Sequence, residues 1–305
     1  MSPVRRGFVL IAVLWVLTAL ASLSLLLSVT GRDTLAAQRN RVTLERARWA
    51  AEGCIAAARS VLAEALASPD HADAAWAAVD STLASSPLLP SLACRLSVRA
   101  LGTTVDVNTA GAEQLSRLLI ARGVPTTQVD SLVDALLDWR DRDDQPRSLG
   151  AEQSWYVAEH RVTPRNAPLA DVRELQYVRG FSALVGLDSL LGVDSTRIAL
   201  GRAPAAVLAS LPGITISAAA RIVQLRERGA LGAELRSVAG ALSPDDRDSL
   251  ALHYADVAPL VTAAPDGWIV RADAPIDESP AIATVEVLLV RQGKLVAVAR
   301  HRSWP

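Results

Sequence analysis

The sequence predicts an α+β fold, in which one long N-terminal helix begins in a membrane and continues into a domain with a small antiparallel sheet and a large helical insertion. Three observations predict this fold. An uncharged apolar run of about twenty residues follows Arg5 and Arg6. No proline interrupts the pattern from that run to Pro69. Strand-like segments lie on both sides of a long helical block, so helices inserted within one small sheet explain the order better than two consecutive domains.

The apolar run extends from Phe8 to about Val29 and can cross a bilayer as a single helix, because about twenty apolar residues match the hydrocarbon thickness. Arg5 and Arg6 are expected to hold its N-terminal end in the cytoplasm, which predicts a single-pass membrane protein whose residues after Val29 lie outside the cytoplasm. Two ordinary interpretations compete. One is a plain anchor, and the other is a cleaved secretory signal cut after Ala21, although the run exceeds the usual length of such signals.

A third interpretation starts from the boundary between Gly7 and Phe8. A short basic leader that ends in glycine and is followed at once by an apolar helix resembles a type IV prepilin leader. The resemblance implies that a prepilin peptidase cuts between Gly7 and Phe8, and that the new amino group of Phe8 is methylated. Major pilins carry a glutamate at the fifth mature position, where this chain has Ala12. Among relatives that omission is typical of one special minor subunit, and it favours a position at the filament tip.

The helical pattern continues beyond the membrane run. Apolar residues recur there at a spacing of seven: Leu35, Val42, Trp49 and Ala56. One helix over residues 8–67 would be roughly 90 Å long at 1.5 Å per residue, with bends expected at Gly31 and Gly53. The alternative is a membrane helix followed by a separate amphipathic helix.

Composition limits the function. The 305 residues are half hydrophobic and carry a formal net charge of -1, which argues against a disordered tail and gives no polybasic footprint for nucleic acid. The four histidines stand in unrelated contexts without a nucleophile motif, so the sequence predicts no enzyme. Cys54 and Cys94 suit an oxidising compartment. They either pair as a disulfide or remain two free buried thiols.

Beyond the long helix, a connector rich in Ala, Ser, Pro and Asp covers residues 68–90. Alternating patterns then predict strands over five segments: 94–100, 104–107, 267–272, 282–290 and 294–300. The last two segments are joined by a Gln292-Gly293 turn and form a hairpin. A helical block from about Asn108 to Val261 separates the first two segments from the others.

This helical block contains a weak internal repeat, in which residues 108–118 align with residues 201–211. The copies continue to Gly123-Val124 and Gly213-Ile214, and then to helices that end near Arg140 and Arg226. The second copy resembles a helix-hairpin-helix unit.

DNA-binding hairpins of this kind usually have glycine on both sides of a hydrophobic residue, so that backbone N–H groups approach a phosphate closely. Thr215 replaces the second glycine, and the balanced charge of the chain weakens phosphate binding. The pattern therefore favours a packing module, and a membrane-tethered DNA-uptake receptor is the alternative function.

Carboxylates crowd the segment 138–152, at the end of a predicted helix and in the following loop. Such oxygen-rich clusters suit Ca²⁺. Four residues fall at the first, third, fifth and twelfth positions of an EF-hand loop: Asp141, Asp143, Gln145 and Glu152. Pro146 stands where that loop requires glycine, so a calcium loop here needs a different backbone path. The alternative is a metal-free ion-pair network with Arg140, Arg142 and Arg147. Trp139 is expected in the core, and Asp138 as a cap or partner.

The same region carries the closest family resemblance. Seven segments share it: 50–53, 107–110, 138–144, 150–152, Tyr156, 164–169 and 174–180. Together with the leader and the missing glutamate, they resemble the minor pseudopilin K family of type II secretion systems. The resemblance is looser over residues 181–200, and the second repeat has diverged to Gly201-Arg202-Ala203.

This resemblance implies a non-enzymatic role. With two other minor pseudopilins, the K subunit is thought to form the tip complex that primes pseudopilus assembly for export of folded proteins across the outer membrane. The major pseudopilin is a further expected partner, and the resemblance implies a single-pass inner-membrane protein with its globular part in the periplasm. It also implies calcium in the globular part, which we assign at this stage to Asp141, Asp143, Asp144 and Glu152. No nucleic-acid partner is expected.

The predicted organisation follows from these segments. Residues 1–7 form the leader, residues 8–67 the long helix with its membrane span at about 8–29, and residues 68–107 a connector with the first strands of a pilin-like domain. Residues 108–261 form the inserted helical domain with two helix-hairpin-helix-like repeats. Residues 262–305 supply the C-terminal strands.

Overall fold

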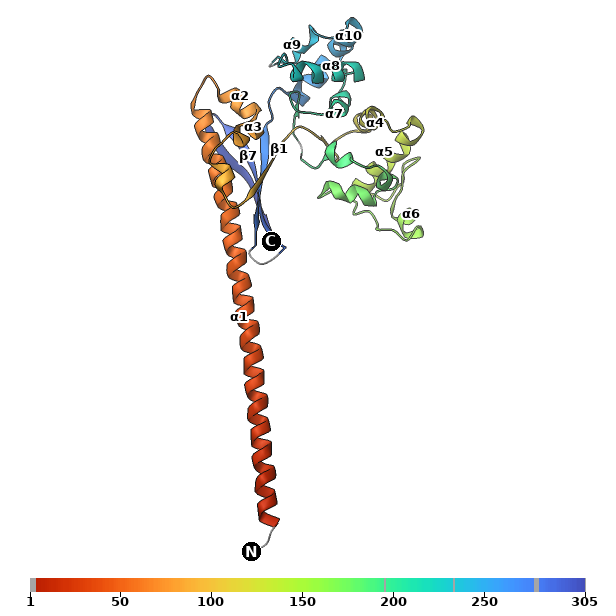
Figure 1. Cartoon of the computed structure of the whole chain (residues 1–305). Coiled ribbons are helices and arrows are strands. Elements are labelled where there is room, and N and C mark those ends of the chain that lie inside the picture. The colour runs from red at the N-terminus through yellow and green to blue at the C-terminus, as the bar shows by residue number, and fades with distance from the viewer. Residues whose placement is uncertain (1–3, 195, 233, 277–279, 305) are drawn as a thin grey trace.

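The structure, a computed structural model, describes residues 4–194, 196–232, 234–276 and 280–304, without the side chains of residues 4–9, 29–31 and 33. It shows the predicted α+β fold: one long helix, a small antiparallel sheet beside its C-terminal half, and a helical domain on the far side of that sheet (Figure 1).

Helix α1 (Val4–Ala67) runs without interruption for 64 residues, about 95 Å at 1.5 Å per residue. Within the described part of the chain, one segment is long and apolar enough to cross a membrane, Leu10–Ser28, and none of it is buried by the protein. Burial begins only at Ala47 and continues to Leu66, where α1 packs on the sheet. The helix therefore has an exposed apolar segment near its N-terminus, an exposed middle part, and a C-terminal part that belongs to a globular core.

Four antiparallel strands form the main sheet in the order β1-β6-β7-β8. Their bounds are Arg95–Ala100, Gly267–Pro275, Ile282–Gln292 and Leu295–Trp304. Alternate residues of β6 and β7, such as Trp268, Val270 and Val287, form one buried cluster with α1. The predicted strands are present at these places, and β7 and β8 meet at the predicted turn after Gln292.

The connector after α1 contains two short helices, α2 (Ala72–Ala77) and α3 (Val79–Ala84), and the 3-10 turn η1 (Leu89–Ser91). Two buried indoles fix it to the sheet. Trp76 Nε1 donates to the carbonyl of Pro265 at 2.9 Å, and Trp268 Nε1 donates to the carbonyl of Trp76 at 2.9 Å. Both indole N–H groups are thereby satisfied inside the core, as burial requires.

The helical domain lies between β1 and β6 in the sequence. Its helices are α4 (Ala112–Ala121), α5 (Thr126–Arg140), α6 (Gln153–Ala158), α7 (Ala205–Ala209), α8 (Ile216–Glu227), α9 (Leu235–Ala239), α10 (Pro244–Leu252) and α11 (Tyr254–Val257). The 3-10 turns are η2 (Val172–Tyr177), η3 (Phe181–Ala183), η4 (Leu187–Ser189) and η5 (Ala258–Leu260).

Two short parallel strand pairs connect this domain to the sheet: β2 (Val105–Asp106) with β3 (Leu191–Gly192), and β4 (Ile198–Ala199) with β5 (Val261–Thr262). The strand predicted over 104–107 is present as β2, but it pairs with β3 and not with the main sheet. Gly102, at φ +75°, turns the chain away from β1 just before it.

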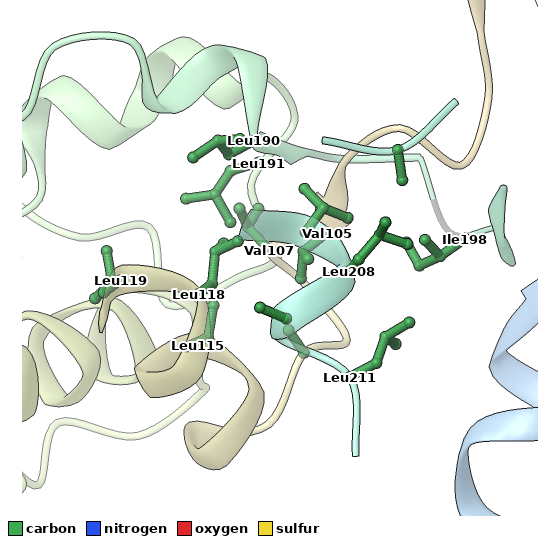
Figure 2. Packing of buried hydrophobic residues seen from close by; sticks show 14 of the residues in the cluster. Val105, Val107, Leu115, Leu118, Leu119, Leu190, Leu191, Ile198, Leu208 and Leu211 are labelled. Carbon is green, nitrogen blue, oxygen red and sulfur yellow. The ribbon is translucent and has the colours of Figure 1, made fainter. Parts of the chain in front are cut away.

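The two repeats are built alike. Arg140, at the end of α5, donates to the carbonyls of Val107 and Ala110, the latter at 2.6 Å. Near the end of α8, Arg226 donates to the carbonyl of Ala203 at 2.6 Å. Ala110 and Ala203 are aligned positions of the sequence repeat, so each copy uses one arginine to close its helix pair. Figure 2 shows the leucines of the two copies, among them Leu118 and Leu208, in one packed cluster.

The hairpin glycines provide a test of this packing. Gly123 and Gly213 both have positive φ, +93° and +70°. A Cβ at Gly123 would meet nothing within 4 Å, whereas a Cβ at Gly213 would lie 2.8 Å from the carbonyl oxygen of Ser249 and from Cβ of His253. We expect Gly123→Ala to lower the free energy of unfolding by about 1 kcal/mol through backbone strain, and Gly213→Ala by about 3 kcal/mol through strain and overlap. Equal losses in denaturant unfolding would contradict the packing of α10 against this hairpin.

Candidate metal centre

Three carboxylates meet where α5 ends and α6 begins. One oxygen from each of Asp138, Asp141 and Glu152 lies within 4.8 Å of the others. Asp138 and Glu152 are 0% and 1% exposed, which is unusual for acidic residues. Asp138 and Asp141 are brought together by their spacing of three residues at the end of α5, and Glu152 lies just before α6.

Arg147 satisfies part of this negative charge. Its Nη1 atom donates to Asp138 Oδ1 at 2.5 Å and to Asp141 Oδ2 at 2.6 Å, and its backbone N–H donates to Asp138 Oδ2 at 3.2 Å. The ion-pair network that the sequence suggests is therefore present for one arginine. Arg140, by contrast, donates to backbone carbonyls of the repeat.

Several oxygens of the cluster have no donor. Among the described residues, the buried side-chain oxygens without a hydrogen bond are Asp141 Oδ1, Glu152 Oε1, Glu152 Oε2 and Asn166 Oδ1. Buried carboxylate oxygens without partners are costly, and native structures leave few of them. Two unpartnered oxygens on Glu152 match the bidentate carboxylate that Ca²⁺ commonly takes, and all four are hard oxygen donors. The residues present therefore fit a calcium ion.

Asn166 is oriented by the acidic loop. Its Nδ2 group donates to the carbonyl of Asp143 at 2.9 Å and to Asp144 Oδ1 at 2.8 Å, so the amide nitrogen is used and the amide oxygen is left over. Its backbone has a φ of 49°, which asparagine tolerates better than most residues.

The surroundings hold this geometry firmly. A Cβ at Gly150 would lie 1.9 Å from Asp138 Oδ2, so only glycine permits this close approach. Arg179 Nη1 donates to the carbonyl of Gly150 at 3.0 Å, and the backbone N–H of Arg179 donates to the Tyr156 hydroxyl at 2.9 Å. The rings of Tyr156 and Trp139 pack edge to face at 5.2 Å, with both side chains buried. These hydrogen bonds and ring contacts fix the segments that surround the carboxylates.

Charge crowding is visible in the ionisation of Glu152. Burial, and then the negative charges of Asp138 and Asp141, raise the pKa of Glu152 to about 7. Hydrogen bonds to Asp141 and to Asp138 raise the pKa of Arg147, so this side chain keeps its positive charge. The single positive charge of Arg147 therefore does not balance the negative charges of the carboxylates around it.

The pKa of Glu152 predicts a pH dependence in calcium-free solution. Below about 4.5 the carboxyl is protonated in both states and has no effect. Above that pH the unfolded chain ionises while the folded chain keeps the proton to about 7, so stability falls across this window. We expect the Glu152→Gln variant to be more stable than the parent protein at pH 7 and to lose this pH dependence in urea unfolding. The same slope in both proteins would contradict the assignment.

The cluster differs from the set predicted from the sequence. Asp141 and Glu152 are present in it, but Asp143 and Asp144 are exposed and accept hydrogen bonds from the Gln145 backbone and Asn166. Asp138, expected as a cap or partner, takes part in it. The helix-end spacing of Asp138 and Asp141 could have indicated this, whereas Asn166 had no signal except its place in the resembling segment 164–169.

The hairpin of the second repeat offers no phosphate site. Thr215 caps α8 by accepting from the Ala218 N–H at 3.0 Å, and it also donates to Asp246. Ser217 and Ser243 donate to the same carboxylate, each at 2.7 Å. Hydrogen bonds from Thr215, Ser243 and Ser217 lower the pKa of Asp246, so a buried negative charge lies beside this hairpin and disfavours an anion there.

The remaining predicted residues lie far from this cluster. Cys54 of α1 and Cys94, just before β1, are joined by a disulfide. Gly7 and Phe8 lie in the first turns of α1, but their side chains fall outside the described part of the chain.

Comparison with known proteins shows which proteins this chain resembles. A sequence profile described as "Type II secretion system (T2SS), protein K" matches residues 94–186, a stretch that contains β1, the three clustered carboxylates and Asn166. The chain is 29% identical over 285 residues to type II secretion system protein K of Dickeya chrysanthemi, covering 74% of this chain and 78% of that protein. The chain is similar to type II secretion system protein K.

A second protein K, from Klebsiella pneumoniae, is 32% identical over 196 residues, which are 59% of each protein. The fold agrees as well. A crystal structure of the GspK-GspI-GspJ complex from enterotoxigenic Escherichia coli matches with a TM-score of 0.61 at 19% identity, covering 88% of this chain and 99% of that chain. The predicted resemblance to the protein K family and the predicted α+β fold are confirmed.

Proposed function

We propose that this chain is the minor pseudopilin at the tip of a type II pseudopilus, where it primes assembly for the export of folded proteins across the outer membrane. The observation that carries this proposal is the combination of an apolar segment without a carboxylate and a bulky helical domain at the opposite end of α1. In a pilin-like filament the carboxylate at the fifth mature position serves a subunit above. This chain has Ala12 there and does not need such a neighbour.

The position of the helical domain supports a tip location. It lies beside the sheet at the end of α1 that is farthest from the N-terminus (Figure 1). A subunit stacked directly above would have to accommodate the whole insertion between β1 and β6.

The same proposal places the protein in the inner membrane, with Leu10–Ser28 as its span and the globular part in the periplasm. Arg5 and Arg6 at the N-terminal side support this orientation, and the Cys54–Cys94 disulfide suits an oxidising compartment. Cleavage by a prepilin peptidase before Phe8 would leave the mature subunit.

Its partners would be other minor pseudopilins. The related structure is a complex of GspK with GspI and GspJ, and we propose the corresponding assembly for this chain. Its role would be structural: Asp138, Asp141, Glu152 and Asn166 would hold a calcium ion that fixes α5, the acidic loop and α6 to one another.

The test is genetic and biochemical. Deleting the chain from a strain with a type II system should stop secretion of a folded substrate, and the full-length chain should restore it. Affinity purification from crosslinked membranes should recover the other minor pseudopilins in equal amounts. Undiminished secretion after deletion, without these partners in the purified material, would overturn the proposal.

A further inference from the structure

A cleft of about 710 Å³ lies between the sheet and the helical domain. One wall is formed by segments of the helical domain within residues 169–173 and 188–194. The other wall is formed by charged residues of β1, β7 and β8: Arg99, Glu286, Arg300 and Arg302. We term this space the interdomain cleft. The buried core of the helical domain and the buried core beneath the sheet share no residue, so the cleft is a gap between two structural units, where proteins commonly bind ligands.

The sheet wall belongs to a basic face. Val285 and Val287 of β7 are buried with α1, so the residues that alternate with them face away from that helix. The strand register extends this outward face over all four strands. Its charged residues are five arginines and two acids: Arg95, Arg99, Arg271, Arg300, Arg302, Asp273 and Glu286. Positive charge therefore dominates the side of the sheet on which the cleft lies.

Two of the arginines in the cleft share one carboxylate from the opposite wall. Asp194 Oδ1 lies 3.0 Å from Arg300 Nη1, and Asp194 Oδ2 lies 3.4 Å from Arg99 Nη2. Arg300 Nε is buried without a hydrogen bond. Among the residues that the structure describes, Arg302 has no side-chain partner for an ion pair or a hydrogen bond. The sheet wall therefore has guanidinium N–H groups that are available to a ligand.

The spacing of these groups fits an extended peptide. Arg300 and Arg302 are alternate residues of β8, so their Cα atoms are about 7 Å apart. Side chains at alternate positions of an extended peptide have the same spacing, so two of its carboxylates can each meet one guanidinium. The opposite wall carries Asp171, which is paired with Arg173, and the exposed Asp188. Peptide N–H groups can donate to Asp188, whereas a phosphate backbone has no donor and would be repelled by this carboxylate.

We propose that the interdomain cleft binds an extended segment of another protein that carries Asp or Glu at alternate positions. Its carboxylates would bind Arg300 and Arg302, and one of them would displace Asp194 from Arg300. Asp194 is thus an internal competitor for the peptide. The site goes beyond the proposed function and does not depend on it, because every residue that lines the cleft lies in the globular part of the chain.

The test measures the fluorescence anisotropy of two labelled peptides with the detergent-solubilised full chain. One peptide alternates Glu with Thr, and the other has Gln in place of each Glu. We expect the Glu peptide to bind roughly tenfold more tightly at low salt, with a difference that shrinks as salt rises. Equal binding of the two peptides would overturn the inference. An oligothymidylate that competes as well as the Glu peptide would also overturn it, in favour of a general polyanion site.

Variants connect this binding to the cleft. Arg300→Gln/Arg302→Gln should weaken binding of the Glu peptide roughly tenfold. The control Arg142→Gln/Arg228→Gln removes the same charge from exposed positions outside the cleft and should leave binding unchanged. Asp194→Asn should tighten binding, because the internal competitor loses its charge, and misfolding cannot produce such a gain. Equal losses in the two double variants, or no gain with Asp194→Asn, would contradict the site.

A last measurement distinguishes another protein from a second copy of this chain as the occupant. Light scattering in the same detergent should give the same mass for the parent chain and for the Arg300→Gln/Arg302→Gln variant. Self-association of the parent chain that this variant abolishes would show that a second copy fills the cleft, and it would overturn the inference.

Discussion

Removal of calcium is expected to lower the thermal midpoint of the detergent-solubilised chain by roughly 10 °C. A ligand at 1,000 times its dissociation constant stabilises the folded state by about 4 kcal/mol, and each kcal/mol shifts the midpoint of a protein of this size by about 2 to 4 °C. The physical reason is the set of unpartnered oxygens on Asp141, Glu152 and Asn166, which a cation would satisfy. Differential scanning with EDTA, and then with excess calcium, measures the effect.

Matched variants identify the ligands. Asp141→Asn and Glu152→Gln should abolish the response to calcium. Asp143→Asn removes the same charge from an exposed position of the loop and should keep the response. Loss of the response with Asp143→Asn would favour the ligand set suggested by the sequence. An identical thermal midpoint with and without calcium in the parent protein would contradict the calcium site and favour the metal-free ion pairs of Arg147.

The second large effect is expected from the disulfide. Reduction of Cys54–Cys94 should lower the free energy of unfolding by about 4 kcal/mol, because the bond closes a loop with a sequence separation of 40 and limits the unfolded chain. Both sulfur positions also belong to the packing between α1 and the sheet. Denaturant unfolding with and without reductant measures this difference.

The control for this experiment is the double variant Cys54→Ser/Cys94→Ser, which should match the reduced parent protein and should not respond to reductant. A parent protein that is equally stable in both conditions would show that the bond contributes nothing.

The sequence predicted helices and strands well where apolar residues recur at one regular spacing. The apolar run and the heptad spacing predicted α1, and alternation predicted β1, β6, β7 and β8 within a few residues. The parallel pair of β2 with β3 had no such signal, because each strand has two residues and its partner lies more than eighty residues away. Pairing between short, distant strands depends on how the helical domain packs, which local periodicity does not contain.

The candidate metal site was also predicted only in part from the sequence. The sequence located the acidic segment and two of its members, Asp141 and Glu152. The family resemblance also assigned Asp143 and Asp144, which are exposed in the structure. Asp138 lies at the predicted end of α5, but no sequence pattern indicated that its side chain is buried beside Glu152, and Asn166 comes from a separate loop. Burial, which selects among the carboxylates, is a property of the folded chain alone.

The most direct test of the account is the mass and N-terminal sequence of the membrane-extracted protein, co-expressed with and without a prepilin peptidase. We expect a mature chain that begins with N-methylated Phe8 only when the peptidase is present. A chain that keeps its original N-terminus under both conditions, or one that begins near Ser22, would contradict the assignment of this protein as a pseudopilin subunit.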